Sequence, residues 1–73
     1  MVLVHGSEMS KKEALGRVFR AIEKAGYDPV KQLSEYILSE DPIYIPNVDG
    51  ARAIIRQIDR ADILSELISE YFK

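Results

Sequence analysis

The chain has 73 residues, 47% of them hydrophobic, and this length accommodates one domain. Ten Lys and Arg residues stand against 12 Asp and Glu residues, and the net charge of −2 argues against bulk nucleic-acid binding, which requires a basic surface. The absence of cysteine excludes disulfides and cysteine-based zinc sites, and the single histidine, His5, cannot form a metal site alone, so we expect no cofactor.

The first predicted helix follows a short N-terminal tail, residues 1–9, and opens the single helical domain that we expect over residues 10–73. Ser10 and Glu13 have the spacing of a capping box, in which each side chain accepts a hydrogen bond from the other residue's backbone. Gly26 predicts the end of this helix, because glycine adopts the left-handed conformation without penalty. The apolar residues between these signals have the i, i+3, i+4, i+7 spacing of one helix face: Leu15, Val18, Phe19 and Ile22.

A second helix is predicted to start directly after the first. Asp28 is a good N-cap, Pro29 suits the first helical position, and we expect the helix to end near Ser39. The side chains expected on its buried side are Val30, Leu33, Ile37 and Leu38.

Residues 40–48 form the next predicted segment. Pro42 and Pro46 prevent a regular helix and push the residues before them toward extended conformations. We expect an ordered loop here, with at most one turn of helix. The side chains expected to hold this loop in place are Ile43, Tyr44 and Ile45.

The C-terminal third of the chain contains two apolar patterns that differ in phase. A third helix is predicted to start near Asp49, with a buried face of Ala51, Ile54, Ile55 and Ile58, and a later pattern consists of Ile63, Leu64, Leu67, Ile68, Tyr71 and Phe72. At about 100° per residue these faces point in roughly opposite directions. We expect a break with Asp59 as N-cap and Asp62 in the new first turn. The alternative is one helix over 51–72 whose second face is a dimer interface.

These elements predict an all-α fold, a compact bundle of four to five short helices. A domain this small buries only about 60% of the surface of its unfolded chain. Small cores usually depend on disulfides, metals or association, and the composition leaves association. We therefore expect a homodimer. We expect no membrane insertion, because no apolar run approaches the ~20 residues that cross a bilayer.

The residues give little support for catalysis. Nucleophilic catalysis needs a base beside a Ser, Thr or Cys, and the chain has no Thr, no Cys and one histidine. The acidic residues are expected at helix caps and on polar faces. Arg52, Arg56 and Arg60 are spaced at i, i+4 and i+8, which places them in one stripe on or just beyond the third helix. They are either a solvated face held in ion pairs or a docking surface for an acidic or phosphorylated partner, since guanidinium groups hold such anions bidentately.

The hydroxyl-bearing side chains allow two interpretations each. The four tyrosines are expected to bury their rings, with an interface role as the alternative: Tyr27, Tyr36, Tyr44 and Tyr71. Ser7 and Ser10 are the serines near the N-terminus and the candidate phosphoacceptors. A cap is the simpler role for Ser10, although a helix N-terminus also favours a phosphate.

From Ala25 onward the chain resembles the IreB family of small bacterial regulatory phosphoproteins. Two segments in this order are the most specific, a Gly-Tyr-Asp-Pro segment at 26–29 and an Asp-Pro-Ile-Tyr-Ile-Pro segment at 41–46. The other residues that carry the resemblance are Gln32-Leu33, Tyr36-Ile37-Leu38-Ser39, Ala51-Arg52, Ile55-Arg56, Asp59-Arg60-Ala61-Asp62-Ile63, Glu66-Leu67 and Tyr71.

This resemblance implies a compact helical homodimer in the cytoplasm that is not an enzyme. It implies phosphorylation by a Ser/Thr kinase with extracellular PASTA domains, dephosphorylation by a cognate phosphatase, and an influence on Clp-type proteolysis of the first committed enzyme of peptidoglycan precursor synthesis. The candidate partners implied are the kinase, the phosphatase, and a Clp-type protease or its adaptor, and the sequence does not single out the direct one. The resemblance also favours a docking role for the arginines Arg52, Arg56 and Arg60.

The chain departs from the family pattern in two respects. It contains no threonine, the usual phosphoacceptor of the family, which leaves Ser7 as a substitute. Asn47 stands where the family usually has an arginine, which removes one positive charge. The alternative function is a helical nucleic-acid-binding module that uses the Arg52/Arg56/Arg60 face, and the overall acidity argues against it.

Overall fold

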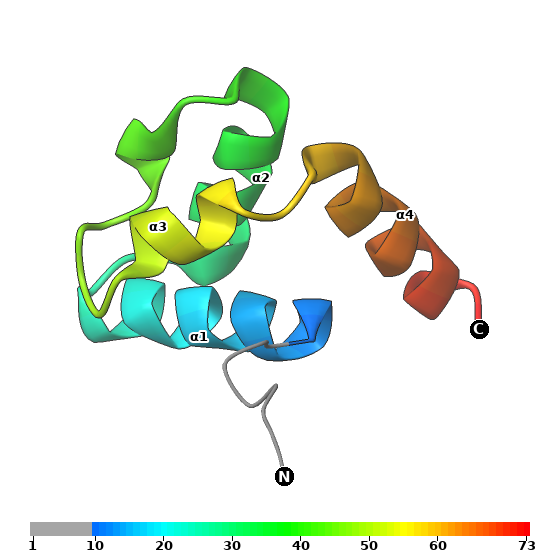
Figure 1. The fold of residues 1–73 in the computed structure, drawn as a ribbon, viewed down its shortest axis with the longest axis horizontal. Coiled ribbons are helices and arrows are strands. Elements are labelled where there is room, and N and C mark those ends of the chain that lie inside the picture. Colours follow the sequence, from blue (N-terminus) through cyan, green and yellow to red (C-terminus); the bar gives the residue numbers. More distant parts are fainter. Residues whose placement is uncertain (1–9) are drawn as a thin grey trace, which may run out of the picture.

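The computed structural model describes residues 10–73, and these contain helices and no strand (Figure 1). The prediction of an all-α fold with four to five short helices is therefore confirmed for the described part of the chain. The elements are α1 (Lys11–Lys24), α2 (Pro29–Ser39), the 3₁₀ helix η2 (Pro42–Tyr44), α3 (Ala51–Arg56) and α4 (Arg60–Tyr71).

The ends of α1 follow the signals in the sequence. The backbone N–H of Glu13 donates to Ser10 Oγ at 3.1 Å, and the backbone N–H of Ser10 donates to Glu13 Oε1 at 3.3 Å, so the capping box is complete. Gly26 follows the C-cap residue Ala25 with φ at 89°, the left-handed conformation that glycine tolerates best. Both ends of α1 are thus fixed by local residues.

The core forms around α1, which packs against both α2 and α3. A fully buried side chain gains about 1.5–3 kcal/mol relative to an exposed one, so this cluster is the main source of stability within one copy. Its members come from every α-helix and from the loop before α3: Val18, Ala21, Ile22, Tyr36, Ile45, Ala51, Ile55 and Ile63.

The buried face of α2 differs from the prediction. Tyr36 is its most buried residue at 6% exposure, while Leu33 and Ile37 are half-buried beside it. Val30 and Leu38 are 67% and 82% exposed, so the prediction that they are buried was wrong. Leu38 lies two residues after Tyr36 and therefore about 200° round the helix, on the side away from α1.

The loop between α2 and α3 is ordered and contains one 3₁₀ turn, as expected. Asp41 caps this turn by accepting from the backbone N–H of Ile43 at 3.1 Å. Ile45 is fully buried and Tyr44 half-buried, but Ile43 is 69% exposed. Ile43 therefore does not hold the loop in place, because the tight turn directs its side chain outward while Ile45 enters the core.

A break separates α3 from α4 where the apolar phase changes, so the alternative of one unbroken helix was wrong. Asp59 is the N-cap of α4 and accepts from the backbone N–H of Ala61 at 2.8 Å, and Asp62 lies in the first turn. Figure 1 shows that α4 then leads away from the other three α-helices. Ile63 is its one buried residue.

We predict that Ile45 and Ile43, two residues apart, differ sharply in their contribution to stability. Ile45→Ala should lower the free energy of unfolding by about 2–5 kcal/mol, because it opens a cavity in the core. Ile43→Ala should change it by about 0.5 kcal/mol or less, because that side chain is already in solvent. Urea denaturation of both variants measures the difference, and equal losses would contradict the burial described here.

Candidate functional site

The three arginines of the predicted stripe lie on two helices. Arg52 and Arg56 belong to α3, while Arg60 is the first residue of α4. Arg60 lies just beyond the third helix, a placement that the sequence prediction allowed, and the break at Asp59 separates it from Arg52 and Arg56. The same break weakens the nucleic-acid alternative, because no one helix carries all three arginines.

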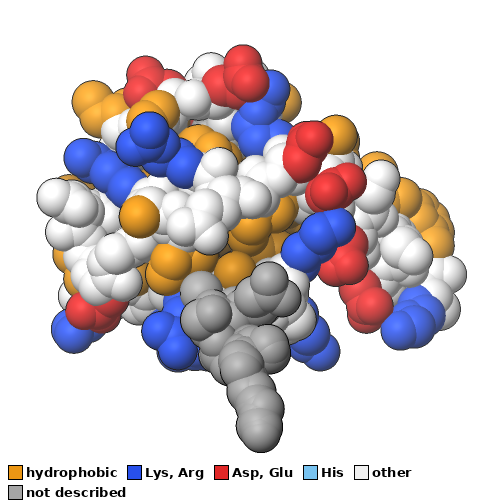
Figure 2. Space-filling model, viewed as in Figure 1, with side chains coloured by type: hydrophobic (Ala, Val, Ile, Leu, Met, Phe, Trp, Pro, Cys, Tyr) orange, Lys and Arg blue, Asp and Glu red, His pale blue; other side chains and the backbone are white. Residues whose placement is uncertain are grey.

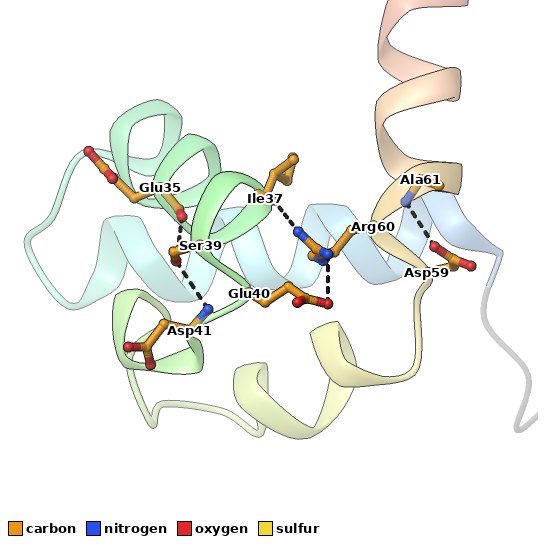
Figure 3. A network of polar contacts seen from close by, with 8 residues as sticks. All are labelled: Glu35, Ile37, Ser39, Glu40, Asp41, Asp59, Arg60 and Ala61. Carbon is orange, nitrogen blue, oxygen red and sulfur yellow. Dashed lines mark hydrogen bonds and ion pairs between the residues drawn. The ribbon is translucent and has the colours of Figure 1, made fainter.

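Arg60 joins the end of α2 to the start of α4 (Figure 3). Its Nη1 donates to the carbonyl oxygen of Ile37, and its Nη2 lies 2.6 Å from Glu40 Oε2. The Ile37 carbonyl is among the last four of α2, which have no partner within the helix, so Arg60 satisfies a helix end. We call this set of contacts the Arg60 clamp. Its role is structural, and it occupies the guanidinium that docking would need.

Arg52 also makes an internal contact. Its Nε donates to the carbonyl oxygen of Ile45 at 2.7 Å, which ties α3 to the loop before it. The side chain is half-buried, and no carboxylate of residues 10–73 lies within ion-pair distance of it. Its positive charge is therefore not neutralised by the described part of the chain.

Arg56 is exposed at the end of α3 and makes no ion pair within residues 10–73. Figure 2 shows Lys and Arg side chains, in blue, gathered at the upper left over the part of the chain that holds η2 and α3. Of the three predicted arginines, Arg56 is thus the one whose geometry leaves the whole guanidinium available to a partner.

A polar pocket of about 470 Å³ opens beside Arg52, between the start of α2, η2 and the loop before α3. It lies where the two segments that carry the family resemblance meet, since Tyr27 comes from residues 26–29 and Tyr44 from residues 41–46. Gln32 lines it and donates from Nε2 to the Tyr44 carbonyl oxygen at 2.9 Å. We call this the Arg52 pocket. Its lining includes Tyr27, Gln32, Ile43, Tyr44, Asn47 and Arg52.

The outer face of α4 is apolar and uncovered. Figure 2 shows hydrophobic side chains, in orange, along the right-hand edge over α4. Their exposed fractions run from about half, for Leu64, Leu67 and Ile68, to 82% for Tyr71 and 79% for Phe72. An apolar groove of about 220 Å³ lies next to this face. The groove is lined by Leu15, Phe19, Leu33, Ile37, Ile63 and Leu67.

We call the exposed side chains of α4 and its C-cap the α4 face: Leu64, Leu67, Ile68, Tyr71 and Phe72. Single exposed apolar residues are ordinary, but a contiguous set beside an apolar groove is typical of an interaction surface. The exposed apolar surface and the groove beside it therefore favour a docking role for this part of the chain over a catalytic one.

Other kinds of site find no support in residues 10–73. No group of three or more His, Asp or Glu side chains there is placed to hold a metal ion. Within the same residues, no helix has both the length and the apolar character that crossing a membrane demands.

A family model described as IreB regulatory phosphoprotein matches residues 2–73, nearly the whole chain. The chain belongs to the IreB family. The resemblance inferred from residues 26–29 and 41–46 is thereby confirmed, and so is a regulatory role at the level of the family description.

For an IreB family member the serines near the N-terminus are of direct interest. Ser10 Oγ accepts the backbone N–H of Glu13 and is therefore engaged in the α1 cap. Ser7 lies outside the described residues, as does His5. Of the tyrosines, Tyr36 is buried as expected and Tyr44 half-buried, whereas Tyr27 and Tyr71 are exposed, contrary to the prediction.

Sequence reasoning missed two features of this IreB chain. The Arg60 clamp joins residues 23 positions apart, and nothing local to Arg60 signals its partners. The Arg52 pocket forms from three segments, and its one signal was the set of tyrosines with an open role. The α4 face was visible as a pattern, but was expected in the core or at a dimer interface.

We predict that Arg60 and Arg56 make unequal contributions to stability. Arg60→Ala should lower the free energy of unfolding by about 1–2 kcal/mol, because it leaves a helix-end carbonyl without its charged donor. Arg56→Ala truncates the same type of side chain at a solvent-exposed position, and should change the free energy of unfolding by less than about 0.5 kcal/mol. Thermal or urea unfolding separates the two, and a neutral Arg60→Ala would refute the clamp.

Proposed function

We propose that this IreB chain is a non-enzymatic regulatory protein of the cytoplasm that works as a homodimer through protein–protein contacts. The observation that carries the proposal is the uncovered α4 face next to an apolar groove. A single copy leaves this surface in water, where it contributes nothing to stability. A second copy offers the same surface and can cover both at once in a two-fold arrangement.

The energetics favour such an association. Fully burying one Leu, Ile or Phe side chain gains about 1.5–3 kcal/mol, and a two-fold interface counts each residue twice. The cost of association is about 4–15 kcal/mol. The α4 face and the groove residue Phe19, which is 39% exposed, are the apolar side chains that each of two copies would bring to such an interface.

We propose that Arg56, with Arg52 beside it on α3, contacts acidic groups of the regulated partner. Its exposure, and the absence of an ion pair to it within residues 10–73, support this for Arg56. Arg60 leaves the proposed contact surface, because its guanidinium is held in the clamp. The docking surface is therefore smaller than the sequence suggested.

The process that we propose is control of cell-wall precursor synthesis, the one that the family resemblance implies. In that scheme a Ser/Thr kinase and its phosphatase set the state of the protein. The protein then alters the rate at which a Clp-type protease, or its adaptor, removes the first committed enzyme of peptidoglycan synthesis. Ser7 is the better candidate phosphoacceptor, because the hydroxyl of Ser10 already serves the α1 cap.

The dimer predicts a specific effect of a charge on the α4 face. Ile68→Glu should convert the dimer to a monomer of 8.3 kDa, because it would bury a carboxylate in an apolar interface. Ser69→Glu adds the same side chain one position later, on the polar side of α4, and should leave the dimer intact. Light scattering coupled to size exclusion measures both masses; the same mass for the two variants would contradict the assigned face.

If Arg56 contacts the partner, reversing the charge at this position should weaken partner binding and leave the fold intact. Arg56→Glu should weaken capture of the Clp-type protease or its adaptor by about tenfold, equivalent to about 1.4 kcal/mol. Lys31→Glu, an exposed reversal on α2, makes the same change in net charge and should bind as the parent protein does. Pull-down with purified components measures the affinity of each variant. Equal losses of affinity would show that net charge, and not the position of Arg56, determines binding.

A further inference from the structure

We propose that a phosphoryl group on Ser7 binds, within its own chain, to the guanidinium groups of Arg17 and Arg20 on α1. The proposal rests on the proposed phosphorylation of Ser7 and adds the site that recognises the product. In that modification a kinase transfers the γ-phosphoryl group of a nucleoside triphosphate to Ser7 Oγ. The Oγ–P bond forms, the bond to the nucleoside diphosphate breaks, and the hydroxyl proton is released.

The outer face of α1 carries a row of cations. Arg17, Arg20 and Lys24 are spaced at i, i+3 and i+7, which places them on one side of the helix. They border a polar hollow of about 610 Å³, and Asp49 is the one acidic residue among those that line it. Figure 2 shows Lys and Arg side chains, in blue, along the lower edge of the molecule, where Figure 1 places α1. We call Arg17, Arg20 and Lys24 the α1 basic row.

Two charges of the α1 basic row are not neutralised by residues 10–73. Lys24 Nζ lies 3.3 Å from Asp49 Oδ2, so these two charges balance each other. Arg17 and Arg20 are exposed, and neither forms an ion pair within the described residues. A phosphorylated serine carries about −1.5 to −2 charges at neutral pH, whereas a carboxylate carries one. The two arginines therefore match a phosphoryl group in charge.

The guanidinium of Arg20 is directed toward the N-terminal end of α1. A Cβ atom built on Gly16 would have Arg20 Nη1 as its nearest neighbour, at 3.4 Å. The Arg20 side chain therefore runs back along the helix by one turn and lies over Gly16. The Cα–Cβ bond of Arg17 tilts the same way, as it does in every α-helical residue. Both side chains thus extend toward the end of α1 that Ser7 precedes.

The chain between Ser7 and α1 is long enough for this contact. Ser7 precedes the cap residue Ser10 by three residues, a segment that spans at most about 10 Å. Arg17 follows Ser10 by seven residues, which is about 10 Å along the helix axis and close to two full turns. Ser10 and Arg17 therefore lie on the same side of α1. A phosphoryl group on Ser7 can reach Arg17, and Arg20 reaches back from one turn further on.

The other place for a phosphoryl group near Ser7 is the N-terminus of α1, and this is already occupied. Ser10 Oγ accepts the backbone N–H of Glu13 at 3.1 Å, and Glu13 Oε1 accepts that of Ser10 at 3.3 Å. The carboxylate of Glu13 thus lies at the helix end, where it repels a second anion. The same contacts hold Glu13 in the cap, and no ion pair joins it to Arg17, four residues later.

The first test is ¹⁵N NMR of the full chain with phosphoserine installed at position 7 during synthesis. Compared with the unmodified chain, the Nε–H signals of Arg17 and Arg20 should shift, while that of Arg56 should not. Equimolar inorganic phosphate added to the unmodified chain should give less than about a tenth of this effect, because a short covalent linker raises the effective concentration to the millimolar range. No shift at Arg17 and Arg20, an equal shift at Arg56, or an equal effect of free phosphate would each overturn the proposal.

The second test measures thermal stability. Phosphorylation of Ser7 should raise the Tm of the parent chain by about 4 °C, and this rise should disappear in Arg17→Gln/Arg20→Gln. Both positions are exposed and Gln has a helix propensity close to that of Arg, so this variant should fold. The matched control Lys31→Gln/Arg56→Gln removes two exposed cations elsewhere and should keep the full rise. A rise that survives in Arg17→Gln/Arg20→Gln would place the phosphoryl group at the helix N-terminus and contradict the assignment.

A third measurement identifies the copy that supplies the phosphoryl group. Unlabelled chain phosphorylated at Ser7 is mixed with ¹⁵N-labelled chain that is not phosphorylated. The labelled Arg17 and Arg20 signals should stay unchanged, because the contact is made within one chain. Shifts of these signals would show that Ser7 reaches a second copy, and would overturn the intramolecular contact.

These readouts separate the α1 site from the proposed function, because the phosphoserine is installed without a kinase. If a Ser/Thr kinase leaves Ser7 unmodified while the shifts at Arg17 and Arg20 are found, the proposed route of control fails and the α1 site stands. If the kinase modifies Ser7 and Arg17→Gln/Arg20→Gln leaves the rise in Tm unchanged, the α1 site is wrong and the proposed function stands.

Discussion

The guanidinium of Arg60 bonds to the last turn of α2 and to Glu40, and this clamp together with the Asp59 cap sets the direction of α4. Because α4 starts a new helix there, its apolar residues do not join the core around α1. They form an uncovered face instead, with Ile63 as the single buried anchor. The surface available for association is thus a direct consequence of where the chain breaks between α3 and α4.

The three arginines on either side of this break have different contacts. Arg60 is held by the Ile37 carbonyl and Glu40, Arg52 donates one hydrogen bond to the Ile45 carbonyl, and Arg56 is exposed. Three arginines that look equivalent in sequence are therefore held to different degrees, from Arg60 with two contacts to Arg56 with none within residues 10–73. Replacing all three arginines together would therefore lower stability and partner binding at the same time. Single substitutions separate an effect on stability from an effect on binding.

Local signals predicted the helix ends well, because each is decided by residues within one turn. The capping box at Ser10, the proline after Asp28 and the cap at Asp59 all hold. The buried side of α2 was less predictable, since Val30 and Leu38 are as apolar as Leu33 and only tertiary packing selects among them. The clamp had no signal in the sequence, and the Arg52 pocket had only the tyrosines whose role was left open, because the parts of each meet only in the folded chain.

The central claim is that the α4 face is covered in solution by a second copy of this IreB chain. The most direct measurement mixes ¹³C-labelled and unlabelled protein and records isotope-filtered NOEs, which arise only between copies. A dimer joined through the α4 face should give intermolecular NOEs from the methyl groups of Leu64 and Ile68. Their absence under conditions where the protein is fully folded, or intermolecular NOEs from another face alone, would contradict it.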